Sequence, residues 1–317
     1  PYTTLFRSAF EGADVPDDTF TDGANATLAV ATLGQLAKKK EPFFLAVGFV
    51  KPHLPFVAPK KYWDLYDPAA IQPAPNPFYP KDAPKYAILN HSGELRSYHD
   101  IPSDLIPADL ARQLKHGYYA AISYADAQVG KVLDELDRLG LRENTIVILW
   151  GDHGWKLGEH SAWAKHSNTE NDTNAPLLIS VPGMKRAGAT SSALVEFVDI
   201  YPSLAELAGL PLPAHLEGTS FKPLLDEPER LWKSAAFSQY PRDKLMGYTM
   251  RTDQYRFTQW VNSKDHTKVI ASELFDHKAD PLENTNVANI PANQEIVKKL
   301  AAQLSAGWQA ALPKNSN

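Results

Sequence analysis

The sequence has no cysteine among its 317 residues, and this absence removes several kinds of chemistry at once. Disulfides, cysteine-ligated zinc sites, iron–sulfur clusters and a cysteine nucleophile are all excluded within these residues. Cysteine usage therefore carries no information about the compartment in which the protein works.

Other features are scarce as well. The longest apolar run, residues 43–50, has eight residues, whereas about twenty are needed to cross a bilayer, so no membrane span is predicted. The N-terminal residues lack the charged region and the apolar region of a signal peptide. With 32 Lys and Arg against 37 Asp and Glu, the net charge of −5 argues against nucleic acid as a partner. A Gly-x-Ser-x-Gly elbow and a P-loop are both missing, which weakens serine-hydrolase and nucleotide-binding interpretations.

The remaining composition is that of an ordinary globular protein, with 44% hydrophobic and 22% charged residues. The length predicts one large domain with a smaller companion. The 25 prolines exceed the usual share of about 5% and indicate many shaped loops. Residues 1–8 do not resemble the rest of the chain, and the sequence enters without Met, so we expect a fragment whose first residues are foreign to the fold.

Apolar patterning predicts an α/β fold in which a mainly parallel sheet is flanked by helices. Continuous apolar runs predict buried strands, and apolar residues recurring at threes and fours predict amphipathic helices. The expected strands are 43–49, 145–150 and 177–181, and the expected helices are 25–40, 109–139 and 195–207.

The pattern changes after about residue 227. Short aromatic-rich runs at 235–240, 247–251 and 255–261 predict antiparallel strands, with a hairpin connection at 252–254. A terminal helix is expected over 294–312. We therefore predict a catalytic α/β domain over 1–228 and a C-terminal antiparallel α+β subdomain over 229–317.

The first concentration of reactive side chains comes after the strand expected at 145–150. Three of the ten histidines and three of the seven tryptophans fall between residues 150 and 166. Asp152 and His153 lie between glycines, and from an irregular turn they could ligate one cation, although an aspartate here is often a turn residue or helix cap. Lys165 is either a solvated charge or a group that neutralises a bound anion.

The second concentration is Lys-Pro-His-Leu-Pro-Phe at 51–56, after the strand expected at 43–49. Prolines stiffen the loop around His53, which either packs beneath an aromatic ring or donates a proton to a substrate oxygen or leaving group. The two clusters together suit the cleavage of an anionic ester at a hard cation. Neither cluster of reactive side chains contains an evident nucleophile.

These segments resemble the sulfatase family of the alkaline-phosphatase-like superfamily, and within it the iduronate-2-sulfatase type. The resemblance rests on collinear motifs in both predicted domains. They are the strand and loop over 42–56, Gly-Asp-His-Gly-Trp with Leu-Gly-Glu-His over 151–160, Trp-Ala-Lys at 163–165, Val-Asp-Ile-Tyr-Pro-Ser-Leu-Ala at 198–205, Ser-Gln-Tyr-Pro-Arg at 238–242 and Glu-Leu-Phe-Asp at 273–276.

The resemblance implies roles for several residues. Asp152 and His153 would be ligands of a calcium ion, one divalent cation. Lys165 and His53 would contact the sulfate group as catalytic residues, with His53 protonating the departing sugar oxygen. Trp155 would line the mouth of the sugar site.

Arg242 would contribute to substrate binding from the C-terminal subdomain, although a structural ion pair is an equal alternative. Family members also carry a Cys/Ser-x-Pro-x-Arg motif that is converted to formylglycine, an early pair of aspartates and a Gly-Lys-x-His element. All three are absent here. We therefore expect an N-terminal truncation, an inactive chain as it stands, and a sheet with uncovered edges and apolar faces.

The implied function is hydrolysis of sulfate esters on a sulfated sugar or polysaccharide, of the uronate 2-sulfate kind, as in glycosaminoglycan degradation. A formylglycine-generating enzyme would be a maturation partner. The parent protein would be exported if bacterial and lysosomal if animal. Two alternatives stay open: a phosphodiester or phosphonate ester hydrolase on the same fold, and a noncatalytic glycan-binding fragment.

Overall fold

The computed structural model describes residues 8–89, 93–103 and 105–313. The expectation about residues 1–8 therefore falls outside the described residues, Ser8 aside. The chain divides into two compact units: the first comprises 1–77, 91–145 and 157–164, and the second comprises 78–90, 146–156 and 165–317. Residues 229–317 lie entirely in the second unit, which also contains strands that come earlier in the sequence. The domain boundary at residue 228 therefore stays a prediction.

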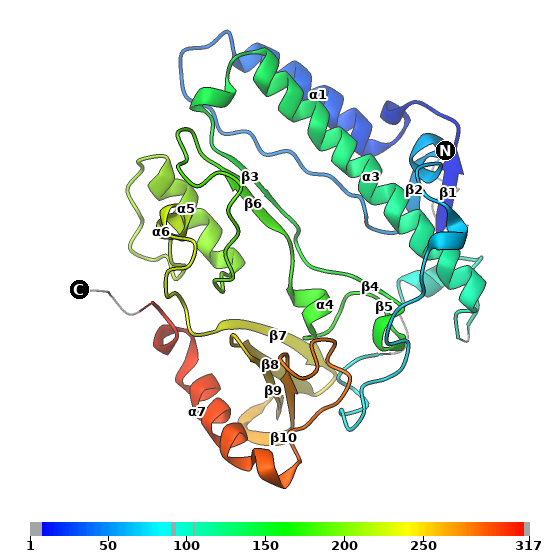
Figure 1. Ribbon diagram of the computed structural model, residues 1–317, viewed down its shortest axis with the longest axis vertical. Helices are drawn as coiled ribbons and strands as arrows, with labels where there is room; N and C mark the ends of the chain where they lie inside the picture. Colours follow the sequence, from blue (N-terminus) through cyan, green and yellow to red (C-terminus); the bar gives the residue numbers. More distant parts are fainter. Residues whose placement is uncertain (1–7, 90–92, 104, 314–317) are drawn as a thin grey trace. The chain divides into compact units, whose positions relative to one another are not determined.

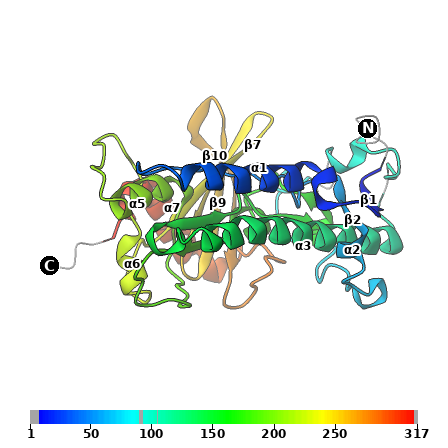
Figure 2. The same ribbon diagram turned by 90° about the horizontal axis from the view of Figure 1, so that it is seen from above.

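The first unit is built around two long helices and a short parallel strand pair. Its helices are α1 (Thr21–Leu36), α2 (Lys60–Trp63) and α3 (Ala108–Arg138), and its strands are β1 (Phe10–Ala13) and β2 (Phe56–Pro59), with β5 (Trp163–Ala164) pairing with β4 (Lys156–Leu157). Short 3-10 turns occur at Asp17–Thr19, Pro68–Ala70, Leu95–Ser97, Arg142–Asn144 and Glu159–Ser161. Helices α1 and α3 lie side by side (Figures 1 and 2).

The long helix predicted over 109–139 is confirmed as α3. Its buried residues include Ala120 and Tyr124, which pack against Ala58 and Tyr62. Gly140 ends the helix with a φ of 69°, and the Leu141 amide donates to the Leu136 carbonyl at 3.0 Å, the pattern of a glycine C-cap. Among the described residues, no helix combines the length and apolar character that crossing a bilayer requires.

The strand predicted over 43–49 is wrong for the described chain. Residues 43–50 alternate between half-buried and exposed, as an extended chain does, but they form no ladder with another described strand. The segment is held near its end, because the buried Asp22 carboxylate accepts from the amides of Val50 and Lys51, each at 2.8 Å, and the Asn25 side-chain amide donates to the Gly48 carbonyl at 2.9 Å. A strand requires a partner, and an apolar run alone does not supply one.

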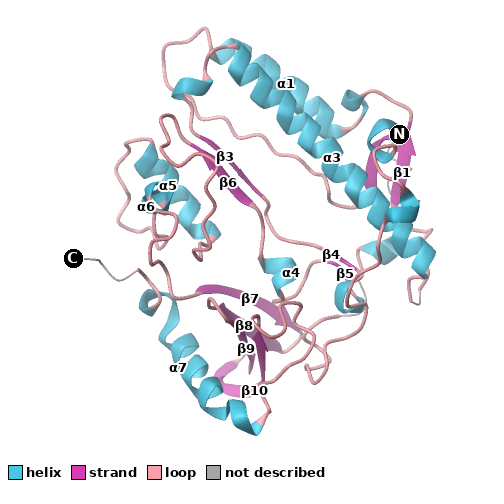
Figure 3. Ribbon diagram, viewed as in Figure 1, coloured by secondary structure: helices cyan, strands magenta, loops and turns pink. Residues whose placement is uncertain are grey.

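The second unit contains a strand pair from the middle of the chain and a separate four-stranded sheet (Figure 3). Its strands are β3 (Val147–Trp150), β6 (Leu177–Ser180), β7 (Ala236–Arg242), β8 (Leu245–Arg251), β9 (Tyr255–Asn262) and β10 (Asp265–Asp276). Its helices are α4 (Glu170–Thr173), α5 (Ile200–Leu207), α6 (Lys222–Asp226) and α7 (Gln294–Ala310), with 3-10 turns at Phe197–Asp199 and Pro291–Asn293.

The direction of pairing between β3 and β6 corrects one detail of the expected sheet. The two strands run antiparallel, with Val147 opposite Ser180 and Trp150 opposite Leu177, whereas β1 and β2 are parallel. The connection from β3 to β6 contains no α-helix longer than the four-residue α4. An antiparallel pair needs no long crossover helix.

The β3–β6 pair is covered on one side only. Ile148, Leu177 and Ile179 pack against the cluster formed by Ile200, Phe221 and Leu224 on and near α5 and α6. On the same two strands, other large apolar side chains are exposed: Leu149 at 41%, Trp150 at 46% and Leu178 at 57%.

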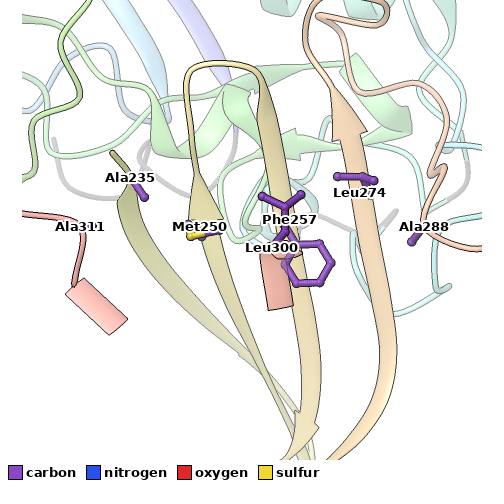
Figure 4. Packing of buried hydrophobic residues seen from close by; sticks show 7 residues of the cluster. All are labelled: Ala235, Met250, Phe257, Leu274, Ala288, Leu300 and Ala311. Atoms are coloured by element: carbon purple, nitrogen blue, oxygen red, sulfur yellow. The ribbon is translucent and has the colours of Figure 1, made fainter. Parts of the chain in front are cut away.

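The four-stranded sheet has the order β10-β9-β8-β7 and is antiparallel throughout. The predicted hairpin at 252–254 joins β8 to β9. Helix α7, predicted over 294–312, places Leu300 on a core that includes Met250, Phe257 and Leu274 (Figure 4). Sequence reasoning missed β10, because its first six residues are exposed and show no apolar alternation.

The Glu273 carboxylate in this sheet is buried and accepts a hydrogen bond from a neutral group. Burial raises the pKa of Glu273 to about 7; the Trp260 indole, which donates at 2.6 Å, lowers it, and the negative charge of Glu283 raises it further. A carboxyl with a raised folded-state pKa contributes most to stability below its unfolded value of 4.5, and that contribution is lost as the pH rises toward 7.

We predict that Glu273→Gln removes this pH dependence. Relative to the wild type, the variant should gain about 2 kcal/mol in free energy of unfolding between pH 5 and pH 8. Urea unfolding at both pH values measures the difference. Glu295→Gln, an exposed control on α7, should show no such gain, and an equal gain in both variants would contradict the assignment.

Candidate active site

The turn after β3 is fixed by backbone contacts to α4 and to the segment that follows this helix. The Gly151 amide donates to the Pro176 carbonyl at 3.0 Å, and the Gly154 amide donates to the Asp172 carbonyl at 2.8 Å. A Cβ at position 154 would lie 1.9 Å from the Asn171 carbonyl oxygen. Glycine is therefore required for the turn to approach α4 so closely.

This turn brings Asp152 and His153 together. His153 Nδ1 lies 2.8 Å from the Gly154 carbonyl, to which it must donate. In the neutral ring, Nε2 then carries a lone pair, and it faces Asp152 Oδ2 at 3.6 Å. Two acceptors facing each other at this distance suit a divalent cation between them, and a backbone bond at the other nitrogen is how ligating histidines are oriented.

Trp155 links this pair to Lys165. The His153 and Trp155 rings stack with centroids 6.1 Å apart and an interplanar angle of 25°. The Lys165 ammonium lies 4.8 Å from the centroid of the Trp155 ring, within the range of a cation–π contact. The second unit thus gathers four of the predicted residues into one cluster.

The backbone around Lys165 is held in an unusual conformation. Ala164 and His166 have φ values of 69° and 93°, a region that costs free energy for residues other than glycine. The Tyr240 hydroxyl lies 2.9 Å from His166 Nδ1. These contacts fix the direction in which the intervening lysine leaves the chain.

Arg242 acts on the same segment. This residue is 7% exposed, and its guanidinium donates to the backbone carbonyls of Tyr86, Ala87 and His166, while it lies 4.4 Å from the Tyr240 ring centroid. The described residues thus give it the role of a positioning residue for the Lys165 segment. Contact with substrate stays a prediction for this side chain.

Sequence reasoning missed the buried lysine between the two parts of the cluster. Lys156 is 1% exposed, pairs with Asp172 at 2.5 Å and donates to the Ser167 hydroxyl at 2.8 Å. The one available signal was a lysine placed between the apolar residues Trp155 and Leu157.

His53 lies in the first unit, in a loop held by its neighbours. The Lys51 ammonium donates to the carbonyls of His53, at 3.0 Å, and Pro55, at 2.6 Å. Burial lowers the pKa of Lys51 to about 8, although the nearby Asp22 charge acts in the opposite direction. The loop is thereby locked around the imidazole.

The imidazole of His53 has an acceptor at each nitrogen. Nδ1 lies 2.8 Å from the Leu54 carbonyl, and Nε2 lies 2.7 Å from Glu94 Oε1. Because a carbonyl and a carboxylate only accept, this geometry suits the doubly protonated ring. Glu94 was missed by sequence reasoning, since it stands far along the chain in a loop-rich stretch without a motif.

A second group of possible metal ligands, Glu170, His277 and Glu283, also occurs in the second unit. Burial alone would raise the pKa of Glu283, but Arg256, His277 and the Glu170 amide lower it to about 2. Arg256 pairs with both carboxylates. These residues therefore form a neutralised ion-pair network and fit a metal poorly.

Comparison with known proteins identifies the family. A family model described as sulfatase matches residues 2–210, and one described as N-sulphoglucosamine sulphohydrolase, C-terminal, matches residues 158–309. The chain belongs to the sulfatase family. The resemblance inferred from the sequence is confirmed.

Among relatives of this sulfatase-family chain are the iduronate 2-sulfatases of Mus musculus and Homo sapiens, 35% and 34% identical. Each alignment covers 87% of this chain and 63% of the relative. The chain thus spans less than two thirds of the length of these relatives. A choline-sulfatase of Rhizobium meliloti is 30% identical, and the alignment covers 88% of this chain and 54% of the length of the relative.

Solved structures establish the fold. A phosphonate monoester hydrolase from Silicibacter pomeroyi has a TM-score of 0.82 at 19% identity, covering 99% of this chain and 66% of its own. A protein solved with its substrate D-glucosamine-2-N,6-O-disulfate has a TM-score of 0.75 at 21% identity, covering 90% of this chain and 70% of its own. The predicted α/β fold of the alkaline-phosphatase-like kind is confirmed.

We predict that Gly154→Ala destabilises the protein by more than about 2 kcal/mol, because the new methyl group collides with backbone that cannot give way. Gly130→Ala is the matched control, since it lies inside α3 with no atom within 4 Å of the added Cβ; it should stabilise by about 0.5–1 kcal/mol. Urea unfolding of both variants measures the contrast, and equal stabilities would refute the close approach.

Proposed function

We propose that this chain is part of a hydrolase that cleaves sulfate esters on an acidic sugar of the uronate 2-sulfate kind. The observation that carries the proposal is the cluster of Asp152, His153, Trp155 and Lys165 within one unit. The identity of 35% to a protein named iduronate 2-sulfatase supports the substrate class. The parent protein would be exported or lysosomal.

The cation in this proposal is calcium, which Asp152 and His153 would hold together with ligands outside the described residues. The carboxylate oxygen suits calcium, whereas an imidazole nitrogen is more typical of zinc, copper, iron and nickel sites; the choice of calcium therefore rests on the family resemblance. When bound, such a cation polarises the oxygens of an ester group. The carboxylate and the oriented imidazole of this chain hold its position.

Lys165 neutralises charge on the sulfate oxygens as a compact ammonium donor. Its contact with the face of Trp155 keeps the long side chain from sampling other rotamers. Trp155 also offers an apolar wall to the sugar ring. Arg242 keeps the backbone beneath Lys165 in place.

His53 donates a proton to the departing sugar oxygen. Its two nitrogens face two acceptors, so the ring carries a proton at Nε2, which Glu94 holds until the departing oxygen takes the place of the carboxylate. The proton moves from Nε2 to the alcohol oxygen as the S–O bond breaks. The nucleophile is a formylglycine on a segment outside these 317 residues, produced by a maturation enzyme, so the chain alone does not turn over substrate.

Hydrolysis of phosphonate or phosphate esters is the second candidate, because the structural likeness to a phosphonate monoester hydrolase reaches a TM-score of 0.82. Both ester classes present an anion to a cation and an ammonium group. A noncatalytic glycan-binding role is the third candidate, since these residues contain no nucleophile of their own.

We predict that the parent protein carrying the formylglycine segment releases sulfate from a uronate 2-sulfate disaccharide, with kcat/KM well above that for the matching phosphate and phosphonate esters. Lys165→Ala should lower kcat by about 10²–10³-fold, and calcium removal should abolish turnover. Lys278→Ala, an exposed lysine of the same unit, should leave the rate unchanged. Faster phosphonate turnover would favour the second candidate, and turnover that withstands chelation would refute the cation's role.

A separate prediction concerns His53. His53→Asn should slow sulfate release from a sugar alcohol by about 10²–10⁴-fold. It should slow release from 4-nitrophenyl sulfate far less, because a good leaving group needs no proton. Single-turnover rates for both substrates measure the contrast, with His99→Asn, an exposed histidine of the same unit, as the control. Equal losses for both substrates would exclude a proton-donor role.

A further inference from the structure

The second unit contains a cavity of about 490 Å³ that uses none of the residues of the candidate active site. Its walls come from residues 192–194, residues 228–234, the β8–β9 turn with Tyr255, and the face of α7 that carries Ile296, Lys299 and Gln303. This volume falls in the range of sites that hold small ligands, about 300–1,000 Å³.

The polar groups in the walls are largely unused by the protein. Tyr255 contributes its hydroxyl, Gln303 its amide and Lys299 its ammonium, and none of these groups makes a side-chain hydrogen bond or ion pair to another described residue. Asp253 is likewise without an ion-pair partner in the described chain. By contrast, Lys233 in the same wall is saturated by Glu196 and Asp199.

Trp232 adds a second, independent observation. Its ring packs against the cluster of Ile200, Phe221 and Leu224 and forms part of the cavity wall. Its indole Nε1 is buried and has no acceptor among the described residues. Buried donors in native proteins are normally paired, so an unmet donor in a cavity wall points to an acceptor that arrives with a ligand.

The combination of groups selects the ligand class. Aromatic surfaces from Trp232 and Tyr255 suit the C–H face of a sugar ring. Amide and carboxylate groups suit its hydroxyls, which both donate and accept. Lys299 suits an anionic substituent, with Arg230, which pairs with Glu227 at 3.8 Å, as a further cation in the wall. A nucleic-acid backbone would call for a denser set of cations.

We propose that this cavity is an accessory site for an acidic saccharide, a sugar bearing a carboxylate or a sulfate group. It would hold a sugar of the polymer chain, or a free oligosaccharide, through contacts separate from those that hold the ester to be cleaved. The choice of an acidic saccharide as the ligand rests on the proposed function. The observation of a cavity with unused polar groups is independent of that proposal.

The test is binding of a sulfated, uronate-containing disaccharide to the full 317-residue chain, measured by calorimetry and tryptophan fluorescence. It is carried out in a Lys165→Ala background to weaken binding at the candidate active site. Saturable binding should persist there. Lys299→Gln and Tyr255→Phe should each raise Kd about tenfold. Lys298→Gln is the matched control, because the neighbouring lysine pairs with Glu295 on the exposed face of α7; it should leave Kd unchanged.

Absence of saturable binding, or equal effects of Lys299→Gln and Lys298→Gln in variants with wild-type circular dichroism, would overturn the proposal. Equal affinity for the uncharged disaccharide would overturn the acidic class. Because this readout needs no turnover, loss of sulfate release by the parent protein with binding intact would refute the proposed function alone. Binding lost with sulfate release intact would refute the accessory site alone.

Discussion

The ion pair between Lys156 and Asp172 is the interaction on which the candidate site depends. Both side chains are almost completely buried, and removing two charges from water is costly unless each is fully satisfied. Asp172 also accepts from Ser167 at 2.6 Å, and its backbone carbonyl receives the Gly154 amide. The turn with the cation-ligand candidates and the segment that follows Lys165 are thus fastened to one buried pair. A change in that pair would move both groups together.

The sequence predicted the parts of the fold that local periodicity specifies. Helix α3 and the β8–β9 hairpin are recognisable because each repeats its apolar residues at its own spacing within a single segment. The segment over 43–50 and strand β10 were misjudged for opposite reasons. The first is apolar but has no partner in the described chain, and the second has partners but starts with exposed residues. Strand identity is settled by a neighbour that the local sequence does not contain.

The same distinction applies to the site. Asp152, His153, Trp155 and Lys165 were predictable as a group because all four come after one strand within fourteen residues of sequence. Glu94 and the bonds of Arg242 to backbone carbonyls were not, since they join segments far apart in the chain. A backbone carbonyl has no residue type, so no sequence pattern indicates where an arginine will find one. Contacts that position catalytic residues are therefore the hardest part of a site to predict from sequence.

His53 and His153 show how one local geometry can serve two kinds of chemistry. In each, Nδ1 faces the carbonyl of the next residue at 2.8 Å, so the ring orientation is set in the same way. The difference lies at Nε2. Glu94 approaches His53 to 2.7 Å, a direct charge-assisted hydrogen bond that calls for a proton and leaves no room for an ion. Asp152 stays 3.6 Å from His153, too far for a good hydrogen bond and close enough to share a cation. In the proposed roles, the distance from the carboxylate thus separates His53 as a proton donor from His153 as a metal ligand.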